Sequence, residues 1–134
     1  MNIAEIKVSE VMNRTLFTIP LNSPLNEILE TMLQNRISAV IVVADSGEFM
    51  GIISKTDIVS ALQKYGANVI EKTAEDLLNP KPYTIEGEAT LAEAVKKMLT
   101  YRVHRLLVIT PSMIGKFMPV GIITATDILK IISQ

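Results

Sequence analysis

The chain has 134 residues, a formal net charge of −1 and no cysteine. This length fits one compact domain, and the missing cysteines exclude disulfides, thiolate catalysis and cysteine-ligated zinc. The small net charge disfavours a large nucleic-acid footprint, and without an apolar run of signal-peptide or membrane-spanning length we expect a cytoplasmic protein with no membrane partner.

The first predicted elements are a short strand and an amphipathic helix. We expect the strand at 17–19 and the helix shortly after it, with Ser23 as the capping residue and Pro24 in the first turn. Apolar residues then recur at helical spacing and predict a face that packs on the core. These residues are Leu25, Ile28, Leu29, Met32 and Leu33.

Two apolar strands and a second helix follow. The strands are expected at 39–44 and 49–54, joined by the turn sequence Asp-Ser-Gly-Glu. The closing helix should start near Lys55, and residues 64–73 should link this half of the chain to the next. Because both strands are nearly continuous apolar runs, both faces of their sheet should be covered.

The second half of the chain repeats this order. Residues 36–43 resemble 102–109 at an offset of 66, and 51–58 match 121–128 at an offset of 70. The four extra residues fall in the loop around 110–118, where an insertion leaves the core register intact. The repeated elements are strands at 83–85, 106–110 and 118–124, a helix capped by Thr90 with an apolar stripe of Leu91, Ala94, Val95, Met98 and Leu99, and a closing helix from Ala125.

The duplication predicts an α+β fold built from two βαββα repeats, residues 1–66 and 67–134. One such repeat would leave apolar sheet surface in water. We therefore expect the two repeats to pack sheet against sheet around a pseudo-twofold axis, as one compact pair.

Each repeat ends with a similar motif at a strand-to-helix junction. Ser54, Lys55 and Asp57 stand in the first motif, and Thr124 and Asp127 in the second. Helix N-termini receive phosphate, and an aspartate in the first turn can accept both hydroxyls of a ribose. The same Ser/Thr-x-x-Asp pattern is also a capping box that only satisfies the helix's own backbone.

The paired apolar strands and the paired Gly-Ile-Ile-Ser/Thr-x-x-Asp motifs, over about residues 8–132, resemble a tandem pair of cystathionine-beta-synthase (CBS) domains, or Bateman module. This resemblance implies a regulatory module that senses AMP, ADP, ATP or a related adenosyl compound such as S-adenosylmethionine in a cleft between the repeats. It implies no obligatory cofactor, a homodimer formed through the CBS helices, and an effector protein that the sequence does not name.

The resemblance also implies two clefts, each joining base contacts from one repeat to ribose contacts from the other. One would use Phe17, Thr18, Ile37 and Ser38 with Thr124 and Asp127; the other would use Tyr83, Thr84, Val103 and His104 with Ser54 and Asp57. Because Arg102, Arg105 and Lys55 accompany His104 in the second cleft, we expect that cleft to hold a phosphorylated ligand more tightly. For Arg36 and Arg102 the alternative is a solvated helix end, which we favour for Arg36. Lys96 and Lys97 are expected on a solvated helix face.

Catalysis is not expected, because no nucleophile has a His–carboxylate arrangement behind it and the single histidine forms no metal cluster. Asp57 and Asp127 belong to opposite clefts and should not share a proton or a metal ion. Two other classes remain open. These are a structural or dimerisation pair with empty clefts, and a weak nucleic-acid binder, which the net charge disfavours.

Overall fold

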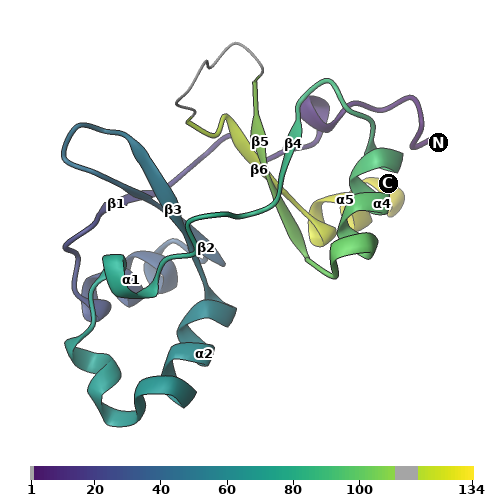
Figure 1. The fold of residues 1–134 in the computed structure, drawn as a ribbon. Helices are drawn as coiled ribbons and strands as arrows, with labels where there is room; N and C mark the ends of the chain where they lie inside the picture. The colour runs from purple at the N-terminus through teal and green to yellow at the C-terminus, as the bar shows by residue number, and fades with distance from the viewer. Residues whose placement is uncertain (1, 111–117) are drawn as a thin grey trace. The chain divides into compact units, whose positions relative to one another are not determined.

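The computed structural model describes residues 2–110 and 118–134, which form two compact units (Figure 1). One unit is 17–82, and the other joins the N-terminal segment up to residue 16 to 83–134. These units divide the chain at other points than the repeats expected at 1–66 and 67–134. Most of the expected insertion at 110–118 lies outside the described residues. Among the described residues, no helix is long and apolar enough to cross a membrane.

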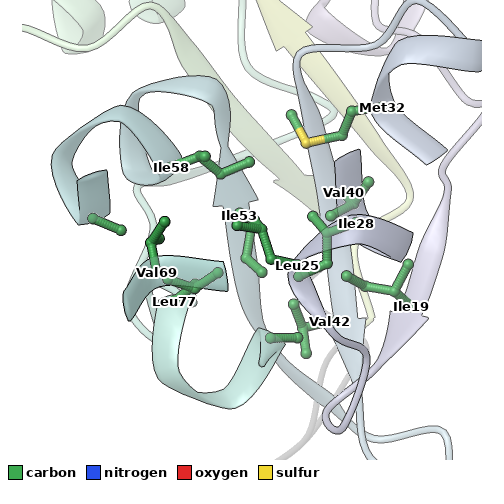
Figure 2. Close-up of a cluster of buried hydrophobic side chains, with 12 residues drawn as sticks. Ile19, Leu25, Ile28, Met32, Val40, Val42, Ile53, Ile58, Val69 and Leu77 are labelled. Atoms are coloured by element: carbon green, nitrogen blue, oxygen red, sulfur yellow. The ribbon is translucent and has the colours of Figure 1, made fainter. Parts of the chain in front are cut away.

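The unit of residues 17–82 is a three-stranded sheet covered by helices. Its strands are β1 (Thr18–Pro20), β2 (Ala39–Val43) and β3 (Phe49–Ser54), in the order β1-β2-β3, with β1 parallel and β3 antiparallel to β2. Its helices are α1 (Leu25–Gln34), α2 (Lys55–Tyr65) and α3 (Ala74–Leu77), and a 3-10 helix spans Gly66–Glu71. Side chains from the sheet and all these helices meet in one aliphatic core (Figure 2).

The unit that contains 83–134 has the same plan. Strands β4 (Thr84–Glu86), β5 (Arg105–Ile109) and β6 (Gly121–Thr124) form the sheet in the order β4-β5-β6, again with one parallel and one antiparallel pair. Helices α4 (Leu91–Tyr101) and α5 (Ala125–Ile132) cover it, with a 3-10 helix at Val8–Glu10. The expected α+β repeat architecture is thereby confirmed.

The N-terminal segment of each repeat packs on the other repeat, which explains where the units divide. The amide of Val8 donates to the Ala89 carbonyl at 2.8 Å, and the amide of Ala74 donates to the Ser23 carbonyl at 2.9 Å. Both partners in the second bond correspond to those in the first at the repeat offset of 66 residues. Val8 and Ala74 are fully buried, so each segment contributes core contacts as well as hydrogen bonds.

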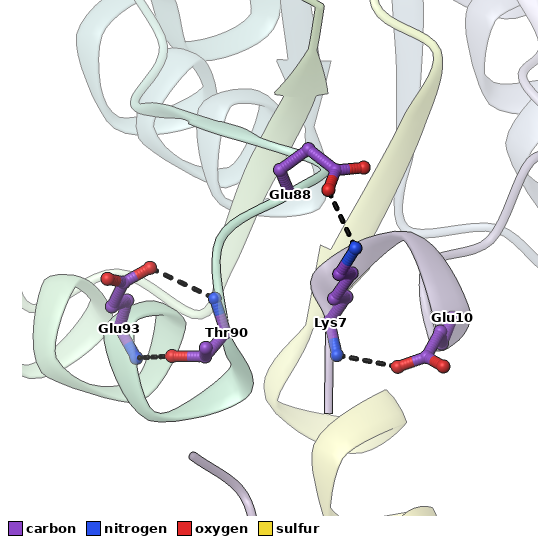
Figure 3. A network of polar contacts seen from close by, with 5 residues as sticks. All are labelled: Lys7, Glu10, Glu88, Thr90 and Glu93. Carbon is purple, nitrogen blue, oxygen red and sulfur yellow. Dashed lines mark hydrogen bonds and ion pairs between the residues drawn. The ribbon is translucent and has the colours of Figure 1, made fainter. Parts of the chain in front are cut away.

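An ion pair also ties the N-terminal segment to the second repeat. Lys7 Nζ lies 2.8 Å from Glu88 Oε2, and the Lys7 amide donates to the Glu10 carboxylate at 2.7 Å (Figure 3). The hydrogen bond to Glu88 is the main cause that raises the pKa of Lys7 above its ordinary value of 10.5. Because both side chains are exposed, salt will screen this pair and its contribution to stability is small.

Two glycines at equivalent places let a neighbouring backbone approach the sheet. Gly51 lies against the backbone of Asn79, where a Cβ would stand 2.5 Å from the carbonyl oxygen. Gly121 lies against Asn13 in the same way, at 2.9 Å. The two asparagines form isolated bridges to Ile52 and Ile122. Glycine is therefore required at both positions by close approach of the chain.

The helix ends differ in part from the sequence expectations. Pro24, not Ser23, is the N-cap of α1, because the carbonyl of the buried Ser23 accepts the hydrogen bond from the Ala74 amide. Arg36 and Arg102 adopt left-handed backbone conformations, with φ of 53° and 54°, just after α1 and α4. Their exposure agrees with solvated helix ends.

Two leucines predicted on the packed helix stripes are in fact exposed. Leu33 is 70% and Leu99 is 74% exposed, while Met32 and Met98 beside them are buried. The apolar stripe of each helix is therefore wider than the surface that its own unit covers.

Candidate functional site

The junction of β3 and α2 is a complete capping box. Asp57 Oδ2 accepts the Ser54 amide at 2.7 Å and the Ser54 hydroxyl at 2.8 Å, and Ser54 Oγ accepts the Asp57 amide at 3.2 Å. The amide of Lys55 donates to the Ser38 carbonyl at 3.1 Å, which ties the first residue of α2 to the start of β2. The motif therefore forms the capping box that was the alternative interpretation of the sequence.

The junction of β6 and α5 is built in the same way. The Thr124 amide donates to Asp127 Oδ2 at 2.9 Å, and the Asp127 amide donates to Thr124 Oγ1 at 3.2 Å. The Ala125 amide donates to the carbonyl of His104 at 2.9 Å, as the Lys55 amide does to Ser38 in the first repeat. Both aspartates are half-buried, and each holds its carboxylate at a fixed place beside the sheet.

This geometry suits a sugar better than a phosphate at the junctions. The amides of Ser54, Lys55 and Asp57 are all bonded within the protein, so only the Thr56 amide lacks an acceptor among the described residues. A carboxylate in the first turn also repels an anion. In contrast, Asp57 Oδ1 has no partner among the described residues and can accept a hydroxyl.

The base-contact residues predicted in the first repeat lie together around β1 and the start of β2. The Phe17 carbonyl accepts the Ile41 amide at 2.8 Å, and Phe17 and Ile37 are half-buried against the core. Thr18 is exposed on the edge strand, and Ser38 is half-buried where the chain enters β2. The structure therefore brings these four residues together within one unit.

Their counterparts in the second repeat also lie within one unit, but with additional contacts. Tyr83 stacks on Tyr101, with ring centroids 4.3 Å apart and planes inclined by 22°. Lys97 Nζ donates to the carbonyl of Thr84. The prediction of a solvated helix face is therefore wrong for Lys97, which is half-buried, and Tyr101 was not singled out from the sequence. Comparing the repeats could have found them, because Thr31 and Asn35 occupy the equivalent places in the first repeat.

The remaining predicted residues surround the start of β5. Val103 and Arg105 are half-buried, and His104 is exposed. An open apolar groove of about 410 Å³ runs beside them, and His104, Ala125, Leu99 and Leu129 contribute to its lining. No group of three or more potential metal-ligating side chains occurs among the described residues. The pairing of base residues from one repeat with ribose residues from the other stays a prediction.

The comparisons with known proteins agree with this architecture. The chain is 31% identical over 126 residues to "Uncharacterized protein MK0525" of Methanopyrus kandleri, covering 94% of this chain and 62% of that protein. It therefore spans less than two thirds of the length of this curated relative.

Solved structures share the fold over almost the whole chain. A conserved protein from Pyrococcus horikoshii superposes with a TM-score of 0.86 at 22% identity, covering 100% of this chain and 96% of that one. The protein CBSX2, solved in complex with AMP, superposes with a TM-score of 0.74 at 22% identity, covering 96% and 97%. The model of the family described as "CBS domain" matches residues 8–64 and 74–134. The chain thus belongs to the CBS domain family as a tandem pair, or Bateman module.

Proposed function

We propose that this CBS pair is a regulatory module that binds an adenine nucleotide, AMP, ADP or ATP, or the related S-adenosylmethionine, without chemical change of the ligand. The observation that carries this proposal is the duplicated junction. Asp57 and Asp127 are each held by a capping box through one oxygen, and no described residue bonds the other oxygen. A fixed, half-buried carboxylate of this kind accepts ribose hydroxyls well.

Two further facts support an adenine ligand. A solved structure with the same fold, CBSX2, contains AMP. The edge strands β1 and β4 present backbone groups beside half-buried apolar side chains, and a flat base with a few polar edges suits such a surface. Bound ligand would favour the arrangement of the two repeats for which it has the higher affinity, and the module would signal through that shift.

The test has two steps. Mass spectrometry of the purified protein identifies any copurified small molecule. Thermal unfolding with AMP, ADP, ATP, S-adenosylmethionine and GMP then ranks the ligands. A ligand at 100 times its dissociation constant should stabilise the protein by about 2.7 kcal/mol. No stabilisation by any adenine compound would contradict the proposal and favour a structural pair, whereas steeply salt-dependent binding of RNA or DNA would favour a nucleic-acid binder.

We also propose that the chain forms a homodimer through its helices. Each unit exposes three large aliphatic side chains on its two main helices, and the three positions are equivalent in the two repeats. They are Leu33, Val59 and Leu62 in one unit and Leu99, Leu129 and Ile132 in the other, each 51–74% exposed. Apolar surface repeated in this way favours association with a second copy, whose identical helices offer the same chemistry.

Sedimentation velocity tests the dimer with the double variant Leu33→Lys/Leu99→Lys. We expect a dimer for the wild type and a folded monomer for the variant, because both side chains are already in water within each unit. The melting temperature of the variant should no longer depend on protein concentration. A wild-type monomer at high micromolar concentration would contradict the proposal.

A further inference from the structure

The free edge of the sheet presents the same backbone groups in both repeats. Among the strands that the structure describes, β1 pairs on one side only, with β2, and β4 pairs on one side only, with β5. The neighbouring strand donates an amide to the carbonyl of Phe17 at 2.8 Å, and to that of Tyr83 at 3.0 Å. Because backbone groups alternate in direction along a strand, the N–H and C=O of the next residues, Thr18 and Thr84, point to the free edge.

In the second repeat, helix α4 closes this edge. Lys97 is half-buried and donates from its ammonium group to the outward carbonyl of Thr84. Tyr101, one helical turn further along α4, stacks on Tyr83. Two consecutive turns of the helix therefore contact Tyr83 and Thr84, and the ammonium group of Lys97 already takes one of the two lone pairs of the Thr84 carbonyl.

In the first repeat, the same edge is open. Thr31 stands at the place of Lys97, and its hydroxyl donates to the Glu27 carbonyl of its own helix at 3.0 Å. Asn35 stands at the place of Tyr101, and its side-chain amide donates to the Thr31 carbonyl at 2.8 Å. Thr18 is exposed, and no described residue donates a hydrogen bond to its carbonyl.

We propose that Lys97 is a specificity-determining residue that excludes adenine from the Thr84 edge, so that the module binds one adenine nucleotide per chain, at the Thr18 edge. This inference rests on the proposed function. An outward C=O beside an outward N–H matches the amino donor and ring-nitrogen acceptor of adenine. The Thr84 carbonyl has a second lone pair, but an adenine amino group placed on it would stand against the ammonium group of Lys97. Displacing that ammonium group would leave a half-buried cation without its partner.

From sequence, the cations around His104 led us to expect the tighter ligand in the cleft that contains Tyr83 and Thr84. Occupancy at the Thr18 edge is the reverse of that order of affinities. Arg102 and His104 are exposed, so water satisfies them without a phosphate. Lys97, in contrast, acts on the base rather than on the phosphate, since its ammonium group is bonded to the backbone carbonyl that the base would use. The same chemistry predicts that the Thr18 edge rejects IMP, whose oxo group presents an acceptor where AMP presents a donor.

Reciprocal exchange of the two equivalent side chains provides the test. Isothermal titration calorimetry with AMP is run on the wild type, on Lys97→Thr and on Thr31→Lys, with IMP as the control ligand. We expect one AMP per wild-type chain and two per Lys97→Thr chain. Thr31→Lys should weaken AMP binding by about 10-fold or more, because it places an ammonium group beside the Thr18 carbonyl.

Each alternative result overturns a defined part of the reasoning. Two equal AMP sites in the wild type, or one site that Lys97→Thr leaves unchanged, would overturn the role of Lys97 while the proposed function stands. Equal binding of IMP would overturn the base-edge chemistry. No AMP binding by any of the three proteins would overturn this inference, and the proposed function falls with it only if ADP, ATP and S-adenosylmethionine do not bind either. If Lys97→Thr does not fold, Lys97→Met keeps the apolar length of the side chain and removes its donors.

Discussion

Replacement of Asp127 by alanine separates a ligand-binding role from a capping role. The variant loses the hydrogen bond from the Thr124 amide, 2.9 Å long and half-buried, and the favourable charge at the N-terminus of α5. These are worth about 0.5–1.5 and 0.3–1 kcal/mol, so we expect a loss of about 1–2 kcal/mol. For a chain of this size each kcal/mol lowers the melting temperature by roughly 3–5 °C.

Asp76 supplies a matched control, because it completes a capping box with Thr73 through bonds of 3.0 and 3.2 Å but belongs to no predicted ligand motif. Differential scanning fluorimetry is run on both variants with and without AMP. Asp76→Ala should lose a similar or smaller stability and keep the full AMP-induced rise. The resemblance pairs Asp127 with the Thr18 edge, so Asp127→Ala should lose that rise. Equal AMP-induced shifts in the two variants would refute the assignment of Asp127 to the ribose.

Three further predictions concern the fold. Gly51→Ala should lower the free energy of unfolding by about 1–3 kcal/mol, because its Cβ would stand 2.5 Å from a backbone carbonyl oxygen. The control Gly87→Ala, whose Cβ would stand 3.4 Å from its nearest neighbour, should change it by no more than about 0.5 kcal/mol, measured by urea unfolding. Arg102→Gly should raise the free energy of unfolding by about 0–1 kcal/mol, because glycine adopts the left-handed conformation at φ 54° without strain. The control Lys96→Gly, inside α4, should lower it by about 1 kcal/mol. Lower stability in both variants would contradict the presence of backbone strain at Arg102. A hydrogen bond from the Thr73 amide is the main cause that lowers the pKa of Asp76 below 3.8. The difference in unfolding free energy between the wild type and Asp76→Asn should therefore be constant above that pH and vanish as the pH falls through the lowered pKa. A difference that grows in acid would contradict this.

The sequence by itself determined the duplication and most of the local structure. Helical spacing of apolar residues placed α1 and α4, and the Ser/Thr-x-x-Asp pattern marked the N-caps Ser54 and Thr124. These signals are local, because a cap or an amphipathic face depends on residues within about one or two turns. The offset between the repeats also grouped Thr18 with Thr84, although it could not distinguish them.

Only the tertiary structure decided which groups are already occupied. The N-cap of α1 is Pro24 and not Ser23, because the Ser23 carbonyl accepts the amide of Ala74, which is distant in sequence. The packing of the segment around Ala74 also explains why the compact units divide at other points than the repeats. In the same way, Lys97 reads in sequence as one of two solvated lysines, yet the fold brings it onto the Thr84 carbonyl. The physical reason is that a hydrogen bond between residues far apart in sequence leaves no periodic signal. It depends on which strand the helix crosses and on which backbone group that strand leaves free.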